Sequence, residues 1–171
     1  RVLYSGGHGS MGFSFPAAIG AYYTTQKPVF SFSGDGGLQM NIQELQFLAR
    51  ERIPIKILLI NNHSLGMIRH FQEMYFSSKF TQTMHEHGYT TPDFVLVAQS
   101  YGIQAIRIND ISELDRVKEL VASPGPALIE FTMSERTYVY PKLAVGQPLY
   151  DQEPLLERGI LKHLLDDWKN E

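Results

Sequence analysis

The sequence contains no cysteine, no long apolar run and no block of basic residues. The absence of cysteine excludes disulfide bonds and thiolate metal sites. No uninterrupted apolar stretch approaches the roughly 20 residues that a membrane-spanning helix needs, and the N-terminus lacks the basic-then-apolar order of a signal peptide. The net charge of −3, without a Lys/Arg cluster, gives no electrostatic reason to expect nucleic acid or an anionic membrane as a partner. We therefore expect neither as a partner. The expected location is the cytoplasm, with a targeting signal upstream of Arg1 as the open alternative.

The chain has the length and composition of one globular domain. Its 171 residues are 43% hydrophobic and 19% charged, which is enough to bury a sizeable core. The sequence starts at Arg1, inside what looks like a strand at residues 2–4, so we expect a piece of a longer protein. Residues 1–137 are expected to form the domain core. Residues 138–171 have an irregular, proline-containing pattern and are expected to be a C-terminal extension that packs on the same domain.

Strand-like and helix-like segments alternate along this core. Apolar runs at residues 29–32 and 55–60 each stop at a small or polar cluster, and hydrophobic residues recur on one helical face between them. Further strands are expected at residues 103–108 and 127–132, with helices before and between them. The alternation predicts an α/β fold with a mostly parallel sheet and helices on both faces.

Several helix boundaries carry recognisable end signals. Asn41, followed three residues later by Glu44, is a candidate capping box for the helix that precedes the second apolar run. Asp93 is expected to open a later helix. Residues 77–92 show no firm period and are expected to form a mobile or substrate-side loop.

Two polar residues follow neighbouring strands. Asp35 and Asn62 come just after the two apolar runs, and the carboxyl ends of parallel strands are where open α/β sheets bind ligands. A carboxylate and an amide oxygen suit Mg²⁺, and Gly34, Gly36 and Gly37 leave room for a diphosphate near the backbone. The alternatives are an Asp35 that only caps a helix and an Asn61–Asn62 pair that only forms a turn.

A glycine-rich loop supports a competing interpretation. Residues 7–12 match the G-x-G-x-x-G fingerprint between a strand and a helix, and Asp35 follows at about the distance of the acid that binds a ribose hydroxyl in dinucleotide-binding proteins. That interpretation leaves the other glycines and the Asn-Asn pair unexplained.

Two sequence motifs resemble those of a known enzyme family. Gly34-Asp35-Gly36, with Asn62 following the aspartate by 27 positions, is similar to the metal and diphosphate motif of thiamine diphosphate enzymes. The longer stretches at residues 34–45 and 61–68 resemble the acetolactate synthase large subunit. The resemblance implies the C-terminal cofactor-binding domain of such an enzyme, with thiamine diphosphate and Mg²⁺ as cofactors.

The resemblance also implies roles for single residues. The Asp35 and Asn62 side chains and the Ser64 carbonyl would hold Mg²⁺. Met11 would serve catalysis as the bulky residue under the bent cofactor, unless it only fills the core. The backbone N–H groups of Gly36, Gly37, Leu65 and Gly66 would bind the diphosphate. The full set of implied cofactor-binding residues is Gly9, Ser10, Met11, Gly34, Asp35, Gly36, Gly37, Asn62, Ser64, Leu65, Gly66 and Met67. Candidate substrate contacts are His8 and Phe71.

The implied reaction is that of a decarboxylating carboligase, which joins an acyl unit from pyruvate to a second 2-oxo acid. In this family a glutamate on a separate domain is also needed, and no segment here matches it. The isolated fragment is therefore expected to be inactive, and the full-length enzyme to be a homodimer or homotetramer. The alternatives are another thiamine diphosphate 2-oxo acid decarboxylase or lyase, and a nicotinamide-binding or non-catalytic domain.

Overall fold

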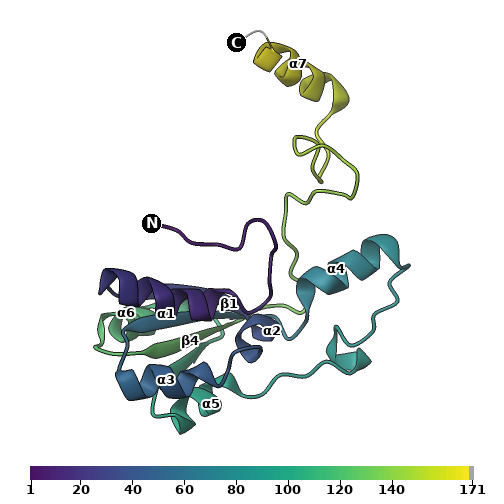
Figure 1. The fold of residues 1–171 in the computed structure, drawn as a ribbon. Coiled ribbons are helices and arrows are strands. Elements are labelled where there is room, and N and C mark those ends of the chain that lie inside the picture. The colour runs from purple at the N-terminus through teal and green to yellow at the C-terminus, as the bar shows by residue number, and fades with distance from the viewer. Residues whose placement is uncertain (170–171) are drawn as a thin grey trace. The chain divides into compact units, whose positions relative to one another are not determined.

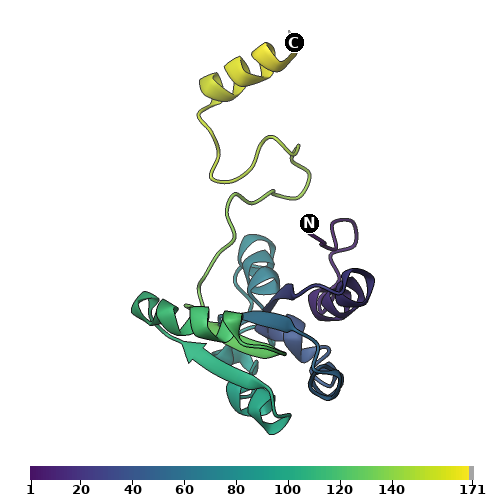
Figure 2. The ribbon, with the colours of Figure 1, turned by 90° about the vertical axis from the view of Figure 1, so that its left-hand side faces the viewer.

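The computed structural model describes residues 1–169, and this part of the chain contains a four-stranded parallel sheet. The strands are β1 (Val29–Gly34), β2 (Ile55–Asn61), β3 (Gln104–Ile108) and β4 (Ala127–Thr132). Their order across the sheet is β1-β2-β4-β3 (Figure 1, Figure 2). The predicted α/β class and parallel sheet are confirmed.

Helices occupy most of the connections between these strands. The described part of the chain has α1 (Ser14–Thr25), α2 (Asp35–Gln39), α3 (Glu44–Glu51), α4 (Gly66–Tyr75), α5 (Phe94–Ser100), α6 (Leu114–Ala122) and α7 (Arg158–Lys169). Short 3₁₀ turns lie at His85–His87 and Ile111–Glu113. The described residues contain no helix with the length and hydrophobicity of a membrane span.

One hydrophobic cluster joins a face of the sheet to helices α1, α2, α3 and α5. Ile57 of β2 pairs in register with Leu128 of β4, and both side chains are fully buried. Buried side chains of α1, α3 and α5, including Phe15, Leu48 and Phe94, belong to the same cluster. Removing this apolar surface from water is the main favourable contribution to folding.

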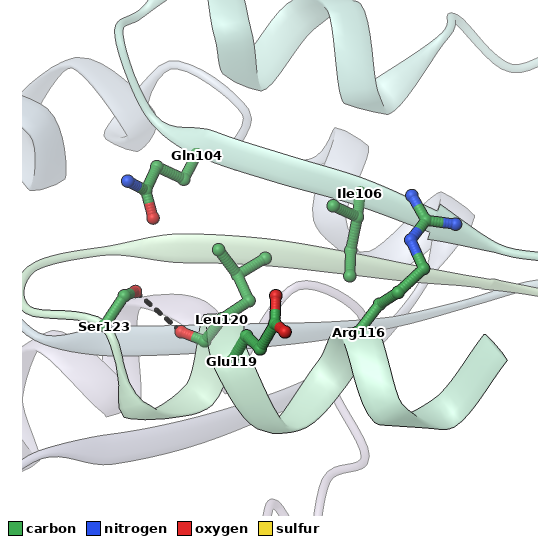
Figure 3. Close-up of a pocket in the computed structure, with 6 residues that line it drawn as sticks. All are labelled: Gln104, Ile106, Arg116, Glu119, Leu120 and Ser123. Carbon is green, nitrogen blue, oxygen red and sulfur yellow. Dashed lines mark hydrogen bonds between the residues drawn. The ribbon is translucent and has the colours of Figure 1, made fainter.

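Helix α6 covers part of the opposite face. Ile106 of β3 follows Ala105, which belongs to the core side, so Ile106 points the other way and meets Leu120 of α6 (Figure 3). A pocket of about 270 Å³ lies between these elements, lined by Gln104, Ile106, Arg116, Glu119, Leu120 and Ser123. It lies toward the amino ends of the strands, away from Asp35.

Two local predictions are wrong. Residues 2–4 do not form a strand, and all three side chains are exposed. An extended segment becomes a strand only when a neighbour completes its hydrogen-bond ladder, and the described chain offers none there. The Asn41–Glu44 capping box is also absent, because α3 begins at Glu44 without a side-chain cap and the Asn41 amide donates to the Gly12 carbonyl at 2.8 Å instead.

A second compact unit begins at Tyr138, and the first one ends at Thr137. Within the second unit, Lys142 and Glu153 form an isolated antiparallel bridge. Arg158, at the start of α7, donates to both carboxylate oxygens of Asp151 at 2.8 and 2.9 Å. These contacts give the extension local structure of its own.

Candidate functional site

The candidate site lies where two adjacent strands end. Strand β1 ends at Gly34 and passes directly into α2, whose first residue is Asp35. Strand β2 ends at Asn61, one residue before Asn62. Because Gly34 pairs with Ile60, both chain segments leave the sheet at the same edge.

The Ser64 N–H brings the two predicted side chains together. It donates to the Asp35 Oδ2 atom at 3.1 Å and to the Asn62 Oδ1 atom at 3.3 Å. A carboxylate oxygen and an amide oxygen therefore converge on one backbone donor. This is the kind of hard oxygen pair that Mg²⁺ accepts from a protein.

The Asp35 carboxylate is buried without a cation. Its residue is only 3% exposed, and within residues 1–169 it forms no ion pair with a lysine, arginine or histidine. Burial raises the pKa of Asp35, against the opposing effect of hydrogen bonds from the Gly36 and Ser64 N–H groups and of the nearby Tyr89 hydroxyl. Buried charges in proteins are normally paired or bound to metal, so this carboxylate fits a cation site.

Gly36 lies at a crowded point beside Asp35. A Cβ atom on Gly36 would come 2.5 Å from Leu65 Cδ2, 3.4 Å from the Tyr89 hydroxyl oxygen and 3.5 Å from Met11 Sδ. A Cβ atom on Gly37 would meet Ser33 Oγ at 2.8 Å. Glycine at these two positions therefore lets the Leu65 and Ser33 side chains pack against the backbone of this turn. Gly34 has more room, since a Cβ atom there would meet only the Ile60 carbonyl oxygen at 3.9 Å.

Tyr89 is a site residue that the sequence analysis missed. Its hydroxyl is buried beside the Asp35 carboxylate and makes no hydrogen bond of normal geometry with any described group. Burial, together with the negative charge of Asp35, raises the pKa of the Tyr89 phenol. An unsatisfied buried hydroxyl is uncommon and indicates room for a further polar partner. The loop at residues 77–92 has no periodicity that would single out this tyrosine.

The glycine-rich loop reaches the same place. Gly12 has a φ of +86°, which favours glycine, and its carbonyl is held by Asn41. Gly9 has a φ of +64°, and its N–H donates to the Ser5 carbonyl at 3.0 Å. Met11 is 50% exposed and lies next to Gly36. The structure thus brings Met11 to the Asp35 turn, while His8 and Ser10 are exposed on the loop.

The backbone at residues 64–66 differs from its predicted use. The Leu65 N–H donates to the Thr83 carbonyl at 3.0 Å, and the Gly66 N–H donates to the Ser64 carbonyl at 2.8 Å. Both N–H groups are therefore satisfied inside the protein and are not free for a diphosphate. The physical reason is the tight turn at Leu65, with φ −74° and ψ 67°, which closes a bond between Gly66 and Ser64. The Ser64 carbonyl keeps a further lone pair for a metal.

Two predicted site residues on α4, Met67 for the cofactor and Phe71 for the substrate, lie on the outer surface of the helix. Met67 and Phe71 are one helical turn apart and both are exposed. The Phe71 ring lies 4.6 Å from the Tyr75 ring and 6.0 Å from the Phe76 ring, centroid to centroid. These residues form an aromatic surface at the end of the segment that carries Asn62 and Ser64.

A family model described as "Thiamine pyrophosphate enzyme, C-terminal TPP binding domain" matches residues 1–131. The chain belongs to this family. Membership decides between the two interpretations of the loop at residues 7–12 in favour of thiamine diphosphate over a nicotinamide cofactor.

Similar proteins have named functions. The chain is 40% identical over 147 residues to the acetolactate synthase large subunit of Lactococcus lactis, covering 85% of this chain and 25% of that protein. It is 32% identical over 168 residues to the mitochondrial acetolactate synthase catalytic subunit of Saccharomyces cerevisiae, covering 94% of this chain and 24% of that protein. The chain thus spans about a quarter of the length of these relatives.

A solved structure shares the fold. It is the thiamine diphosphate-dependent 4-hydroxybenzoylformate decarboxylase of Rhodococcus jostii RHA1, with a TM-score of 0.67 and 27% sequence identity, covering 75% of this chain and 24% of that one. The features of this site agree with membership in the thiamine pyrophosphate family. The buried unpaired Asp35, the side-chain-free turn at Gly36 and Gly37 and the unsatisfied Tyr89 hydroxyl fit a metal-bound diphosphate.

Proposed function

We propose that this chain is the cofactor-binding domain of an acetolactate synthase-like carboligase, and that it holds the diphosphate of thiamine diphosphate through Mg²⁺. The observation that carries the proposal is the buried Asp35 carboxylate, which forms no ion pair with a cationic side chain among the described residues. The Ser64 N–H donates both to this carboxylate and to the Asn62 amide oxygen. Asp35, Asn62 and the Ser64 carbonyl are the proposed metal ligands. Waters and diphosphate oxygens would complete the coordination, as Mg²⁺ usually requires.

The proposed roles of the remaining residues are binding and orientation. Thiamine diphosphate, when bound, supplies the electron sink for decarboxylation of a 2-oxo acid and transfer of the acyl unit. The turn at Gly36 and Gly37 lets the diphosphate approach the backbone. Met11, beside that turn, supports the cofactor from the glycine-rich loop, and Tyr89 offers its hydroxyl to a group bound next to Asp35.

The proposed substrates are pyruvate and a second 2-oxo acid. Support comes from relatives that are named acetolactate synthases. Met67 and Phe71 of α4, with His8 of the loop, are the proposed substrate-side residues. The full-length enzyme is proposed to be a cytoplasmic homodimer or homotetramer.

A second candidate is a simple 2-oxo acid decarboxylase. The similar solved structure is named a decarboxylase of 4-hydroxybenzoylformate, which is a 2-oxo acid, so this chemistry occurs on the same fold. The two candidates differ in what accepts the acyl unit. In a carboligase the acyl unit is joined to a second 2-oxo acid, and in a decarboxylase it takes up a proton and is released as an aldehyde.

Binding and product analysis on the full-length protein test the proposal. Calorimetry is expected to show thiamine diphosphate binding that depends on Mg²⁺, and no binding of NAD. Feeding pyruvate, alone and with 2-oxobutyrate, is expected to give acetolactate and the mixed product. Acetaldehyde without acetolactate would support the decarboxylase instead, and cofactor binding that is indifferent to Mg²⁺ would refute the metal assignment.

A further inference from the structure

We propose that the buried carboxylate of Glu130 is a positioning residue for the metal site. Glu130 lies on β4, outside every motif of the family resemblance, and is 1% exposed. It holds the Asn61 side chain, which in turn fixes the turn that carries Asn62 and Ser64. The inference rests on the proposed function, because only the proposed function makes Asn62 and Ser64 of this turn metal ligands.

Asn61 is held at both ends of its amide group. Its Nδ2 atom donates to Glu130 Oε1 at 2.6 Å, and its Oδ1 atom accepts from the His63 N–H at 2.9 Å. Asn61 is 1% exposed, so water does not replace these partners. The Asn61 side chain therefore transmits the position of Glu130 to the backbone two residues later.

The turn that Asn61 holds is conformationally demanding. His63 has a φ of +52°, in the left-handed region that residues other than glycine rarely adopt. The next N–H, that of Ser64, is the donor on which Asp35 and Asn62 converge. On the other side, the Asn61 carbonyl accepts from the Met133 N–H at 2.8 Å. The turn is thus anchored to β4 and its continuation by both side chain and backbone.

Glu130 needs both of its oxygens for this role. Its second oxygen, Oε2, accepts from Arg107 Nε at 2.9 Å, and Arg107 Nη2 lies 2.8 Å from Asp93 Oδ1. Asp93 caps α5 by accepting from the Leu96 N–H at 3.0 Å. A carboxylate can accept from Asn61 and Arg107 together, whereas a glutamine offers one acceptor and turns a donor toward one of them.

Lys56 provides a matched control on the neighbouring strand. It is also a buried charge, on β2, and its Nζ donates to the Ser123 and Gly125 carbonyls at 2.8 and 2.9 Å. These contacts hold the connection between α6 and β4, at the opposite end of the sheet from Asn61. Loss of Lys56 therefore perturbs the fold without touching the metal turn.

The test compares Glu130→Gln and Lys56→Met with the wild type in the full-length protein. The readout is the Mg²⁺ concentration that gives half-maximal thiamine diphosphate binding, measured beside the thermal midpoint. Glu130→Gln is expected to raise that concentration about 10- to 100-fold, the usual cost of losing a partner that orients a metal ligand, and excess Mg²⁺ is expected to restore binding. Lys56→Met is expected to lower the thermal midpoint and leave the Mg²⁺ requirement unchanged.

An unchanged Mg²⁺ requirement in Glu130→Gln, with a lowered thermal midpoint, would show that Glu130 is only structural and would overturn the inference. If Glu130→Gln does not fold, Arg107→Gln is the second variant, because Arg107 is 37% exposed at its side chain and its loss frees the second Glu130 oxygen. It is expected to raise the Mg²⁺ requirement in the same direction. If cofactor binding by the wild-type protein does not depend on Mg²⁺, the proposed function itself is refuted. If wild-type binding depends on Mg²⁺ and the variants have the same Mg²⁺ requirement as the wild type, only the role of Glu130 is refuted.

Discussion

Asp35 sets the electrostatics of the site at the scale of one residue. Because burial raises the Asp35 pKa above its ordinary value of 3.8, the folded metal-free protein binds this proton more tightly than the unfolded chain does. The stabilisation from protonated Asp35 is fully present below that ordinary value. It is lost as the pH rises through the higher pKa of the folded state. Above that pKa the ionised carboxylate, which has no cationic partner among the described residues, opposes folding.

The substitution Asp35→Asn is expected to separate stability from binding. It keeps the side-chain shape and removes the buried charge. The metal-free variant should therefore unfold a few degrees above the wild type at pH 7, while Mg²⁺-dependent cofactor binding is lost. The stability difference should shrink as the pH falls toward 3.8, where the wild-type carboxyl becomes neutral. Scanning calorimetry across this pH range and a cofactor titration measure the two effects.

The same substitution on an exposed residue is the control for Asp35. Asp115 of α6 is exposed and pairs with Lys118 on the surface, so Asp115→Asn should change the free energy of unfolding by less than about 0.5 kcal/mol. An Asp35→Asn protein that is less stable than the wild type at pH 7, or that still binds cofactor through Mg²⁺, would contradict the account of this carboxylate.

Helix ends show which element boundaries local chemistry decides. Asp93 was predicted to open a helix, and it does cap α5 through the Leu96 N–H. Asn41 has an equally good sequence signal and does not cap α3, which begins three residues later at Glu44, and its Nδ2 donates to the carbonyl of Gly12, 29 residues earlier. Whether a side chain caps a helix depends on whether it bonds to the local backbone or to a group from a distant part of the chain.

Removal of the α5 cap is expected to destabilise the protein. The substitution Asp93→Ala should lower the free energy of unfolding by about 0.5–2 kcal/mol at pH 7, the usual cost of losing an N-cap. Its hydrogen bond to the Leu96 N–H, followed by its contacts with Arg107, lowers the pKa of Asp93. Its contribution is therefore present above pH 3.8 and fades as the pH falls through the lowered pKa. Urea unfolding at pH 7 measures the loss, and an unchanged midpoint would contradict it.

At the scale of the whole molecule, the chain represents about a quarter of the relatives that it matches. The proposed diphosphate anchor and cofactor support lie within the described residues, and the family resemblance implies a further acid–base glutamate on another domain. Residues 1–171 alone are therefore expected to show no detectable turnover of pyruvate, in contrast to the full-length enzyme, because that glutamate is absent. Steady-state assays of the two proteins at equal site concentration give the comparison. Equal turnover would place all catalytic groups in this chain.

The sequence by itself determined the parallel sheet and the place of the site. Apolar runs that end abruptly fix where β1, β2 and β4 stop, and parallel strands must expose their carboxyl ends at one edge, so Asp35 and Asn62 were predictable as neighbours.

Only the tertiary structure decided the partners that come from distant segments. Tyr89 reaches Asp35 across an aperiodic loop, Glu130 reaches Asn61 from another strand, and Thr83 occupies the Leu65 N–H. No local pattern encodes these contacts. Each depends on the path of chain that packs over the sheet, so its atoms meet only after the core has formed.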